Sequence, residues 1–379
     1  MNEMTLQSEV TAKEPVLYLA LELSEKGWKL ALSNGMRVRE ANVKKGDELE
    51  LGKAIESARV KFNLPEKVRR VSCYEAGRDG FWIHRRLIAM GVENHVVDSS
   101  SIEVDRRQRR AKTDRIDAGK LLSQLVRYHR GEKQALRVVS VPKASDEDGR
   151  RPTRELERLK KERTQHTNRI RSLMALHGVN VPVGKNFLKA FEAARPKDVE
   201  QWPPALRAEL VREFERLQLA EKQIVELEKS QLEMVKEKTS DGLVAKVVSL
   251  MTLYGVGIKG GWVLGAEFFG WRKFKNRREV GSAAGLTPTP FASGYVGREQ
   301  GISKAGNRRV RAVMVELAWC WLRYQPDSDL SHWYQEKFGK GASRSRRVGI
   351  VALARQLLVA LWRFVEQGIV PGGARLKAA

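Results

Sequence analysis

The chain has 379 residues, which is enough for two or three domains with a hydrophobic core. Its 70 lysine and arginine residues exceed its 46 aspartate and glutamate residues, and the formal net charge of +24 predicts a polyanionic partner and salt-sensitive binding. We find no signal segment and no run of about 18 apolar residues, so we expect a soluble cytosolic protein without a membrane. Cys73 and Cys320 lie in apolar segments without metal-ligand spacing, so we expect buried free thiols, and the sequence supports neither a zinc finger nor a disulfide framework.

The first third of the chain has the pattern of a mixed sheet with helices. Apolar runs of strand length alternate with segments whose apolar positions recur every three or four residues. A meander of three strands, followed by strands that alternate with helices, predicts an α/β domain. The predicted strands span residues 16–23, 28–33, 36–43, 70–74 and 95–97, and the predicted helices span 51–62 and 81–90.

Two glutamates fall at the ends of neighbouring predicted strands. Glu22 lies late in an otherwise apolar strand, and Glu75 directly follows the strand at 70–74. Side chains from several strands converge at the carboxyl edge of such a sheet. A buried carboxylate costs several kcal/mol unless it is paired or bound to a metal. We therefore interpret Glu22 as a carboxylate that is paired or bound to a metal, and the alternative is a strand-end glutamate that faces water.

The segment 110–117 places two carboxylates inside a dense run of cations. Asp114 and Asp117 are three residues apart at the start of a predicted helix, so the two positions share a face. Like charges at that distance favour a cation between them, and a hard divalent ion takes oxygen ligands and contacts phosphate oxygens. The alternative is a solvated helix face with ordinary Asp–Arg pairing. The surrounding cations, which would hold a phosphate backbone, are Arg106, Arg107, Arg109, Arg110, Lys112 and Arg115.

The section at 141–240 changes to strongly charged helices. After a polar linker at 143–151, apolar residues recur at helical spacing over 156–173 and again over 210–234. Two such seams predict an antiparallel hairpin or an oligomeric coiled coil. We interpret His166, in the first seam, as a residue that sets register rather than one that binds a metal. The section is expected to act as a spacer and a dimerisation element.

The last third is predicted to be mainly helical. Residues 253–260, with Gly255 and Gly257, resemble a helix-hairpin-helix turn, in which backbone N–H groups hold a phosphate, and the alternative is a plain inter-helix turn. A loop at 301–309 is rich in glycine, hydroxyls and cations, and it is suited to a nucleic-acid backbone. A final helix is predicted at about 348–365. The candidate phosphate ligands of the loop are Lys304, Asn307, Arg308 and Arg309.

Several short motifs follow one another along essentially the whole chain, and together they match the pattern of one protein family. They are Glu22 on its strand, Tyr74-Glu75-Ala76-Gly77, Lys112-Thr113-Asp114-Arg115-Ile116-Asp117, Gly255-Val256-Gly257, Ala284-Gly285-Leu286-Thr287-Pro288, Ser293-Gly294 and Gly301-Ile302-Ser303-Lys304-Ala305-Gly306-Asn307. In this combination the chain resembles the transposases of insertion-sequence family one-ten and its eleven-eleven subgroup, which are RNA-guided DNA recombinases of mobile elements.

The resemblance implies an α/β domain followed by all-α parts. It implies a RuvC-like, RNase H-like metal-binding domain at 1–140 and a helical coiled-coil oligomerisation segment, with a linker, at 141–240. A C-terminal serine transposase domain at 241–370 and a disordered tail at 371–379 complete the expected organisation. The implied partners are the DNA of the element ends and target, a structured guide RNA, and further copies of the chain in a dimer or tetramer. The implied location is the bacterial cytoplasm, in association with the nucleoid.

The resemblance also implies roles for individual residues. Glu22, Glu75, Asp114 and Asp117 would bind a divalent metal, with Mg²⁺ favoured, and Ser293 would form a covalent phosphoserine link with DNA. The first acid of this family is usually aspartate, so a glutamate at position 22 departs from the pattern, and Glu25 is the fallback.

Two other functions remain open from the residues alone. The carboxylates by themselves would suit a metal-dependent, junction-specific endonuclease that uses water as the nucleophile. A nucleic-acid-binding protein without catalytic activity is the third possibility.

Overall fold

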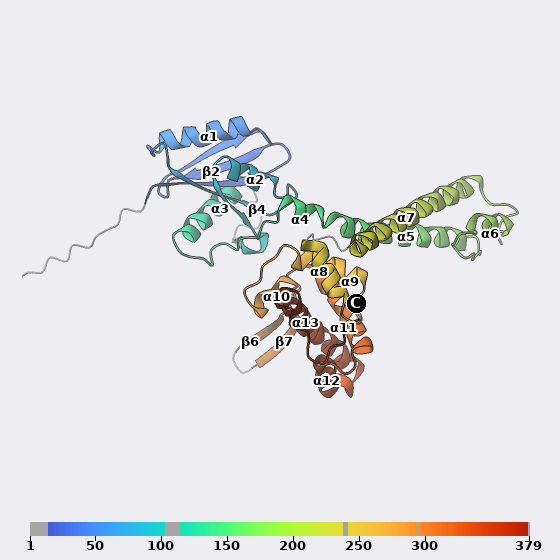
Figure 1. Ribbon diagram of the computed structural model, residues 1–379. Helices are drawn as coiled ribbons and strands as arrows, with labels where there is room; N and C mark the ends of the chain where they lie inside the picture. Colours follow the sequence, from blue (N-terminus) through green and yellow to red (C-terminus); the bar gives the residue numbers. More distant parts are fainter. Residues whose placement is uncertain (1–13, 103–113, 238–241, 294–295, 378–379) are drawn as a thin grey trace, which may run out of the picture. The chain divides into compact units, whose positions relative to one another are not determined.

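The computed structural model describes residues 14–102, 114–237, 242–293 and 296–377, except for the side chains at 100, 114–117, 290–293 and 296–300. The chain divides into two compact units, Met1–Val141 and Pro142–Ala379 (Figure 1). Unit 1 contains the sheet with its helices, and unit 2 contains a long helical hairpin together with a mainly helical bundle.

Unit 1 is built on a five-stranded mixed sheet with the strand order β3-β2-β1-β4-β5. The first three strands form an antiparallel meander, and β1, β4 and β5 run parallel to one another. This arrangement is compatible with an RNase H-like domain, and it confirms the predicted mixed sheet. The strands are β1 (Val16–Leu23), β2 (Trp28–Ser33), β3 (Val38–Val43), β4 (Arg69–Glu75) and β5 (Glu93–Val97).

Alternate side chains of the strands pack against helices on opposite faces of this sheet. On one face, Leu17, Leu19 and Leu21 join a core cluster with α1 (Glu48–Lys61) and α2 (Trp82–Ala89). On the other face, Val16, Tyr18 and Ala20 pack against α3 (Asp114–His129), as Figure 1 shows for the helices. Because neighbouring residues of a strand point to opposite faces, the odd and even positions of β1 bury different cores.

The first large element of unit 2 is a long hairpin of two antiparallel helices, α5 (Arg151–Ala175) and α7 (Pro204–Lys236), which lie side by side in Figure 1. The apolar seam of α5 therefore packs against α7 of the same chain. Two short helices were not predicted. One is α4 (Ala144–Asp148), in the segment expected to be a linker, and the other is α6 (Phe187–Ala193), at the far end of the hairpin.

A polar group interrupts the apolar seam of this hairpin. Glu213 of α7 is buried, and its carboxylate contacts the Nδ1 atom of His166 at 2.7 Å, Arg169 at 3.1 Å and Arg216 at 2.6 Å. The hydrogen bond agrees with the interpretation that His166 fixes the register of the two helices. A carboxylate with this many partners can be buried at a small net cost, while a shifted register would leave it buried without them.

The rest of unit 2 packs around one apolar core, to which α8, α9, η3, α10, α11 and α13 all contribute. A two-stranded antiparallel hairpin, β6–β7, extends from this bundle and was not predicted from the sequence. The elements are α8 (Gly242–Met251), α9 (Ile258–Leu264), the π-helical η3 (Gly265–Phe269), α10 (Arg277–Ala283), β6 (Pro288–Ser293), β7 (Val296–Ile302), α11 (Arg308–Tyr324), α12 (Asp329–Tyr334), the π-helical η4 (Gln335–Gly339) and α13 (Ser343–Gln367).

Helix α13 is, within the described ranges, the one helix that has the length and composition needed to cross a membrane. Its residues Ile350, Leu353, Leu357 and Leu361 are buried in the core of unit 2. The central helix of a packed bundle has the same apolar composition, so this feature is weak evidence for a membrane span.

The segment after Pro371 was expected to be disordered, and the structure corrects this expectation for the residues up to Lys377. Leu376 forms a β-bridge with Leu253. The buried side chain of Gln325 accepts a hydrogen bond from the Arg375 N–H at 2.7 Å and donates one to the Arg375 carbonyl at 2.9 Å. These partners come from a distant part of the chain, so the composition of the tail gives no sign of them.

Candidate active site

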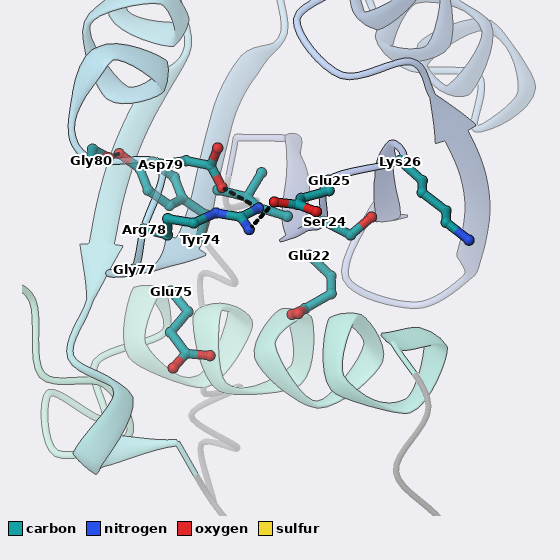
Figure 2. Close-up of a pocket in the computed structure, with 11 residues that line it drawn as sticks. Glu22, Ser24, Glu25, Lys26, Tyr74, Glu75, Gly77, Arg78, Asp79 and Gly80 are labelled. Atoms are coloured by element: carbon teal, nitrogen blue, oxygen red, sulfur yellow. Dashed lines mark hydrogen bonds and ion pairs between the residues drawn. The ribbon is translucent and has the colours of Figure 1, made fainter. Parts of the chain in front are cut away.

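Glu22 and Glu75 occupy corresponding positions at the carboxyl ends of two adjacent parallel strands. The register of β1 and β4 pairs Leu21 with Tyr74, so the next step along both strands brings Glu22 beside Glu75. Both glutamate side chains are half-buried. Figure 2 shows both carboxylates pointing towards α3. This is the face of the sheet on which the side chains two positions earlier, Ala20 and Cys73, also lie. The structure thus brings together two of the four predicted ligands.

Helix α3 carries the other two predicted ligands in its first turn, and its direction is fixed by contacts with the sheet. The hydroxyl of Tyr18, early in β1, lies 2.9 Å from Nδ1 of His129 at the end of α3. Further along, the Cys73 thiol lies 3.8 Å from the Leu121 carbonyl oxygen. The helix therefore runs antiparallel to β1 and β4, and its first turn lies towards the carboxyl edge of the sheet.

The helical repeat adds a second constraint on these two positions. Ala118 and Leu121 are buried against the sheet, and positions 114 and 117 precede them by four residues each, which is about one helical turn. The side chains of Asp114 and Asp117 lie outside the described residues. Their place as ligands stays a prediction, now supported by the backbone to which they are attached.

An open pocket of about 600 Å³ borders the two glutamates. Its other wall contains Glu25 and Asp79, and each of these carboxylates has a cation partner. Glu25 contacts Arg78 at 2.5 Å, and Asp79 contacts Lys45 at 3.0 Å. Figure 2 shows Glu25 directed at Arg78, away from the α3 side. The geometry therefore favours Glu22 over Glu25 as the first carboxylate.

The donor chemistry of this edge suits a hard divalent cation, because carboxylate oxygens are the ligands that such ions prefer. Among the described side chains, histidine, cysteine, aspartate and glutamate form no group of three or more able to hold a metal. A complete site would need the aspartates of α3 in addition to Glu22 and Glu75.

Ser293 is the last residue of β6. It pairs with Val296 of β7 at the turn end of the β6–β7 hairpin, away from the bundle. Its side chain lies outside the described residues.

The base of this hairpin is held by two loops that pack tightly together. The N–H groups of Ser303 and Lys304 donate to the carbonyls of Thr287 and Gly285, at 2.8 and 3.1 Å. A Cβ atom on Gly306 would come within 2.5 Å of the Gly285 nitrogen, so only glycine fits at this crossing. The two late sequence motifs are therefore the two halves of one structural support for the hairpin.

Asn307 has a structural role in this support. Its side-chain oxygen accepts hydrogen bonds from the backbone N–H groups of Arg309 and Val310 and so caps α11. Its Nδ2 atom donates to Glu267 at 3.2 Å. Arg308 and Arg309 both approach Glu157 of α5, while Lys304 is exposed. Phosphate binding by these residues stays a prediction.

Glu267 was missed by the sequence analysis, although a single acid in the apolar run 262–269 was a usable signal. It lies in the π-helical turn η3 with its side chain 1% exposed, and it pairs with Arg154 of α5 through contacts of 2.6 and 2.9 Å. Burial raises the pKa of Glu267, but hydrogen bonds from Arg154 and Asn307 and the charge of Arg154 lower it below its usual range. The carboxylate is therefore ionised and links α5 to the cap of α11.

Replacing Glu267 by glutamine is expected to destabilise unit 2 by about 3 kcal/mol at neutral pH, because Arg154 loses its buried partner. Since the folded-state pKa of Glu267 is lowered, its stabilising contribution is complete above the unfolded-state pKa. It is lost as the pH falls through the folded-state value, so the difference between wild type and variant should shrink in acid. Urea unfolding at several pH values measures both effects.

The matched control is Glu316→Gln. Glu316 pairs with Lys259 at 2.8 Å on the surface, where a pair contributes about 0–1 kcal/mol. Equal free energies of unfolding for Glu267→Gln and Glu316→Gln would show that the buried pair does not stabilise the unit.

The turn with Gly255 and Gly257 joins α8 to α9, as expected for either interpretation of the sequence. Gly255 has a φ angle of +87°, and a Cβ atom there would lie 3.4 Å from the Cys320 carbonyl oxygen of α11. Packing therefore accounts for Gly255 without a phosphate. Gly257 has open space around its Cα atom.

Arg106, Arg107, Arg109, Arg110 and Lys112 lie outside the described residues, as does the side chain of Arg115.

Comparison with known proteins gives one family and several relatives. A family model described as "Transposase IS116/IS110/IS902 family" matches residues 248–332, from within α8 to within α12. The putative transposase y4rJ of Sinorhizobium fredii (strain NBRC 101917 / NGR234) is 42% identical over 312 residues, which cover 80% of this chain and 78% of the relative.

Two further relatives are more distant. The transposase for insertion sequence element IS1328 of Yersinia enterocolitica is 27% identical over 215 residues, 56% of this chain and 61% of the relative. The putative transposase y4qE of Sinorhizobium fredii is 29% identical over 259 residues, 67% of this chain and 59% of the relative.

Proposed function

Because this chain belongs to the IS116/IS110/IS902 family of insertion-sequence transposases, we propose that it cuts and rejoins DNA through a covalent phosphoserine at Ser293. The family assignment makes DNA its partner. The serine intermediate, the metal site and the guide RNA are parts of the proposal that rest on the motif resemblance and on the geometry of each unit.

One observation in unit 1 carries the metal part of the proposal. Glu22 and Glu75 meet at the carboxyl edge of the sheet, on the face covered by the helix that begins with Asp114 and Asp117. Carboxylates gathered from two strands and one helix turn are costly to place together unless a cation binds them.

The proposed chemistry begins at the Ser293 hydroxyl, which is a poor nucleophile until its proton is removed. Its oxygen attacks a DNA phosphorus atom, a new P–O bond forms, and the bond to one sugar oxygen breaks. The hydroxyl proton passes to a base, and the departing sugar oxygen gains a proton. A sugar hydroxyl of the other strand then attacks the phosphoserine, which rejoins DNA and restores the serine.

Glu22, Glu75, Asp114 and Asp117 would hold the divalent ion. A bound Mg²⁺ would offset charge on the phosphate oxygens and lower the proton affinity of an oxygen ligand. Without a bound cation, the negative charge of Glu22 and Glu75 would repel a phosphate from this edge of the sheet.

The remaining parts of the proposal concern partners. A structured guide RNA would select donor and target DNA, and the net charge of +24 is compatible with two polyanions. The α5–α7 hairpin would form the contact between protomers. In support, Leu219, Val225 and Leu232 of α7 are 56, 63 and 41% exposed. Such apolar side chains on a helix are available for a second copy.

The decisive experiment is a trapping assay with the full-length protein, element-end DNA and RNA copurified from cells that carry the native flanking DNA. A protein–DNA adduct that survives denaturant and maps to the peptide containing Ser293 supports the recombinase. Free cleaved ends without an adduct would instead support the metal-dependent endonuclease, in which water attacks. Absence of cleavage and strand exchange would leave a binding protein.

Binding to nucleic acid is expected to weaken steeply with added salt, because each neutralised phosphate releases counterions. Replacing Arg107 and Arg110 together by alanine should reduce the slope of log K against log salt by about 1.8 for duplex DNA, about 0.9 for each phosphate lost. Fluorescence anisotropy at several salt concentrations measures the slope. Arg37→Ala, at an exposed turn of the sheet, is the control, and an equal slope in all three proteins would place the footprint elsewhere.

A further inference from the structure

Three distant segments of unit 2 meet around a second open pocket of about 600 Å³. The turn between α8 and α9 contributes Tyr254, and the end of α11 contributes Arg323 and Tyr324. The C-terminal segment contributes Arg375 and Leu376. None of the residues that line this pocket, all within the described ranges, is acidic. The wall therefore combines two aromatic rings with two cations.

The pocket is fixed by one buried side chain. Gln325 is 1% exposed, and its Nε2 atom donates to the carbonyls of Tyr254 and Arg375, at 3.0 and 2.9 Å. Its Oε1 atom accepts from the Arg375 N–H at 2.7 Å. The bridge between Leu253 and Leu376 adds a second link. The three walls are thus held in place without a ligand, which lowers the entropy cost of binding one.

Both aromatic residues of the pocket are exposed to solvent. Tyr254 and Tyr324 are 43 and 45% exposed, although side chains of this size usually bury their rings against other apolar groups. The Arg323 guanidinium lies 5.4 Å from the centre of the Tyr324 ring, and Arg375 donates to the Tyr324 carbonyl at 3.1 Å. That bond uses one of the five N–H groups of Arg375.

We propose that this pocket binds an unpaired base of a single-stranded nucleic acid, with the base stacked on tyrosine and the adjoining phosphates on Arg323 and Arg375. Aromatic rings stack on any base, and arginine neutralises the backbone, which is how proteins hold single strands without reading sequence. An apolar peptide would desolvate both arginines without a partner. The bases of a duplex are stacked on one another, so their faces are not available to the tyrosine rings. The site goes beyond the proposed chemistry and does not involve Ser293.

The test uses full-length protein carrying Ser293→Ala, so that no reaction competes with binding. The probes are fluorescent 12-nucleotide oligo(dT), oligo(U) and a 12-base-pair duplex. Replacing Tyr324 by alanine should weaken binding of a single strand about tenfold at every salt concentration, because stacking is worth about 1–3 kcal/mol per base. Replacing Arg323 by alanine should instead lower the salt slope by about 0.7, the value for one phosphate of a single strand.

Two controls separate stacking from loss of structure. Tyr324→Phe keeps the ring and should bind within about twofold of the parent protein. Trp319→Ala removes another aromatic side chain of α11, 51% exposed but outside the pocket, and should also leave affinity unchanged. Duplex affinity should be the same for all of these proteins.

Photocrosslinking of the Ser293→Ala protein, the parent of the other variants, tests the pocket without a substitution in it. Oligo(dT) with 5-iododeoxyuridine, or oligo(U) with 4-thiouridine, should crosslink to the peptides that contain Tyr254 or Tyr324. Stronger crosslinking of one probe would identify opened DNA or RNA as the source of the base. Crosslinks to other peptides only, together with parental affinity in Tyr324→Ala, would overturn the proposal. Either result is independent of whether Ser293 is the nucleophile.

Discussion

Ser293→Ala is expected to abolish the denaturant-resistant protein–DNA adduct and to reduce strand transfer at least about a thousandfold, because the attacking oxygen is removed. The substitution deletes one oxygen atom at the end of β6 and should leave the fold of the hairpin in place. Adduct formation on labelled element ends, followed by denaturing electrophoresis, measures the first effect. Joining of donor and target DNA measures the second.

Ser303→Ala is the matched control. Ser303 directly follows β7 at the base of the hairpin, where its hydroxyl accepts a hydrogen bond from the Thr287 hydroxyl at 3.3 Å. It should form the adduct at a rate near that of the wild type. An adduct of normal yield in Ser293→Ala, or its loss in Ser303→Ala alone, would move the nucleophile to another residue and defeat the proposed chemistry.

Glu75→Gln is expected to reduce adduct formation about a hundredfold or more without unfolding unit 1. An amide in place of the carboxylate removes negative charge from the metal site, and bound metal supplies several kcal/mol to phosphoryl chemistry. Glu22→Gln should have a similar effect, while Glu22→Asp should keep part of the activity because the carboxylate remains. Adduct rates at increasing Mg²⁺, with circular dichroism to check folding, measure these effects.

Glu25→Gln controls for the general acidity of this pocket. Glu25 is 76% exposed and pairs with Arg78, so its replacement should change the rate less than twofold. Wild-type rates in both Glu22→Gln and Glu75→Gln would show that the edge of the sheet takes no part in the reaction. Wild-type rates in chelator would exclude a role for a metal.

The strands of unit 1 could be predicted because a short run of neighbouring residues is enough to indicate each one. The runs at 16–23 and 28–33 match β1 and β2 residue for residue, because an apolar run of four to eight residues next to a turn signal such as Gly27 is typical of a buried strand. Choosing between Glu22 and Glu25 needed the structure, because only the fold shows that Glu22 points towards α3 while Glu25 points at Arg78, 53 positions away in sequence.

The β6–β7 hairpin could not be predicted by the same rules. Its first strand contains Pro288 and Pro290, and proline is depleted in strands because it lacks an N–H donor. The hairpin is specified instead by the loops at its base, where Gly285 and Gly306 allow a close backbone crossing. That crossing depends on residues 21 positions apart. Glu267 and the C-terminal segment escaped prediction for a similar reason, because their partners are distant in sequence.

The pairing of Glu267 has a mechanical consequence. Arg154 lies in the first turn of α5, and its guanidinium donates to the Glu267 carboxylate. Asn307 donates to the same carboxylate and is the N-cap of α11, the helix that follows β7. The α5–α7 hairpin and the base of the β6–β7 hairpin are therefore coupled through the Glu267 carboxylate. If the α5–α7 hairpin tilts relative to the bundle, either Asn307 moves with it or the buried Glu267 carboxylate loses its contact with Arg154.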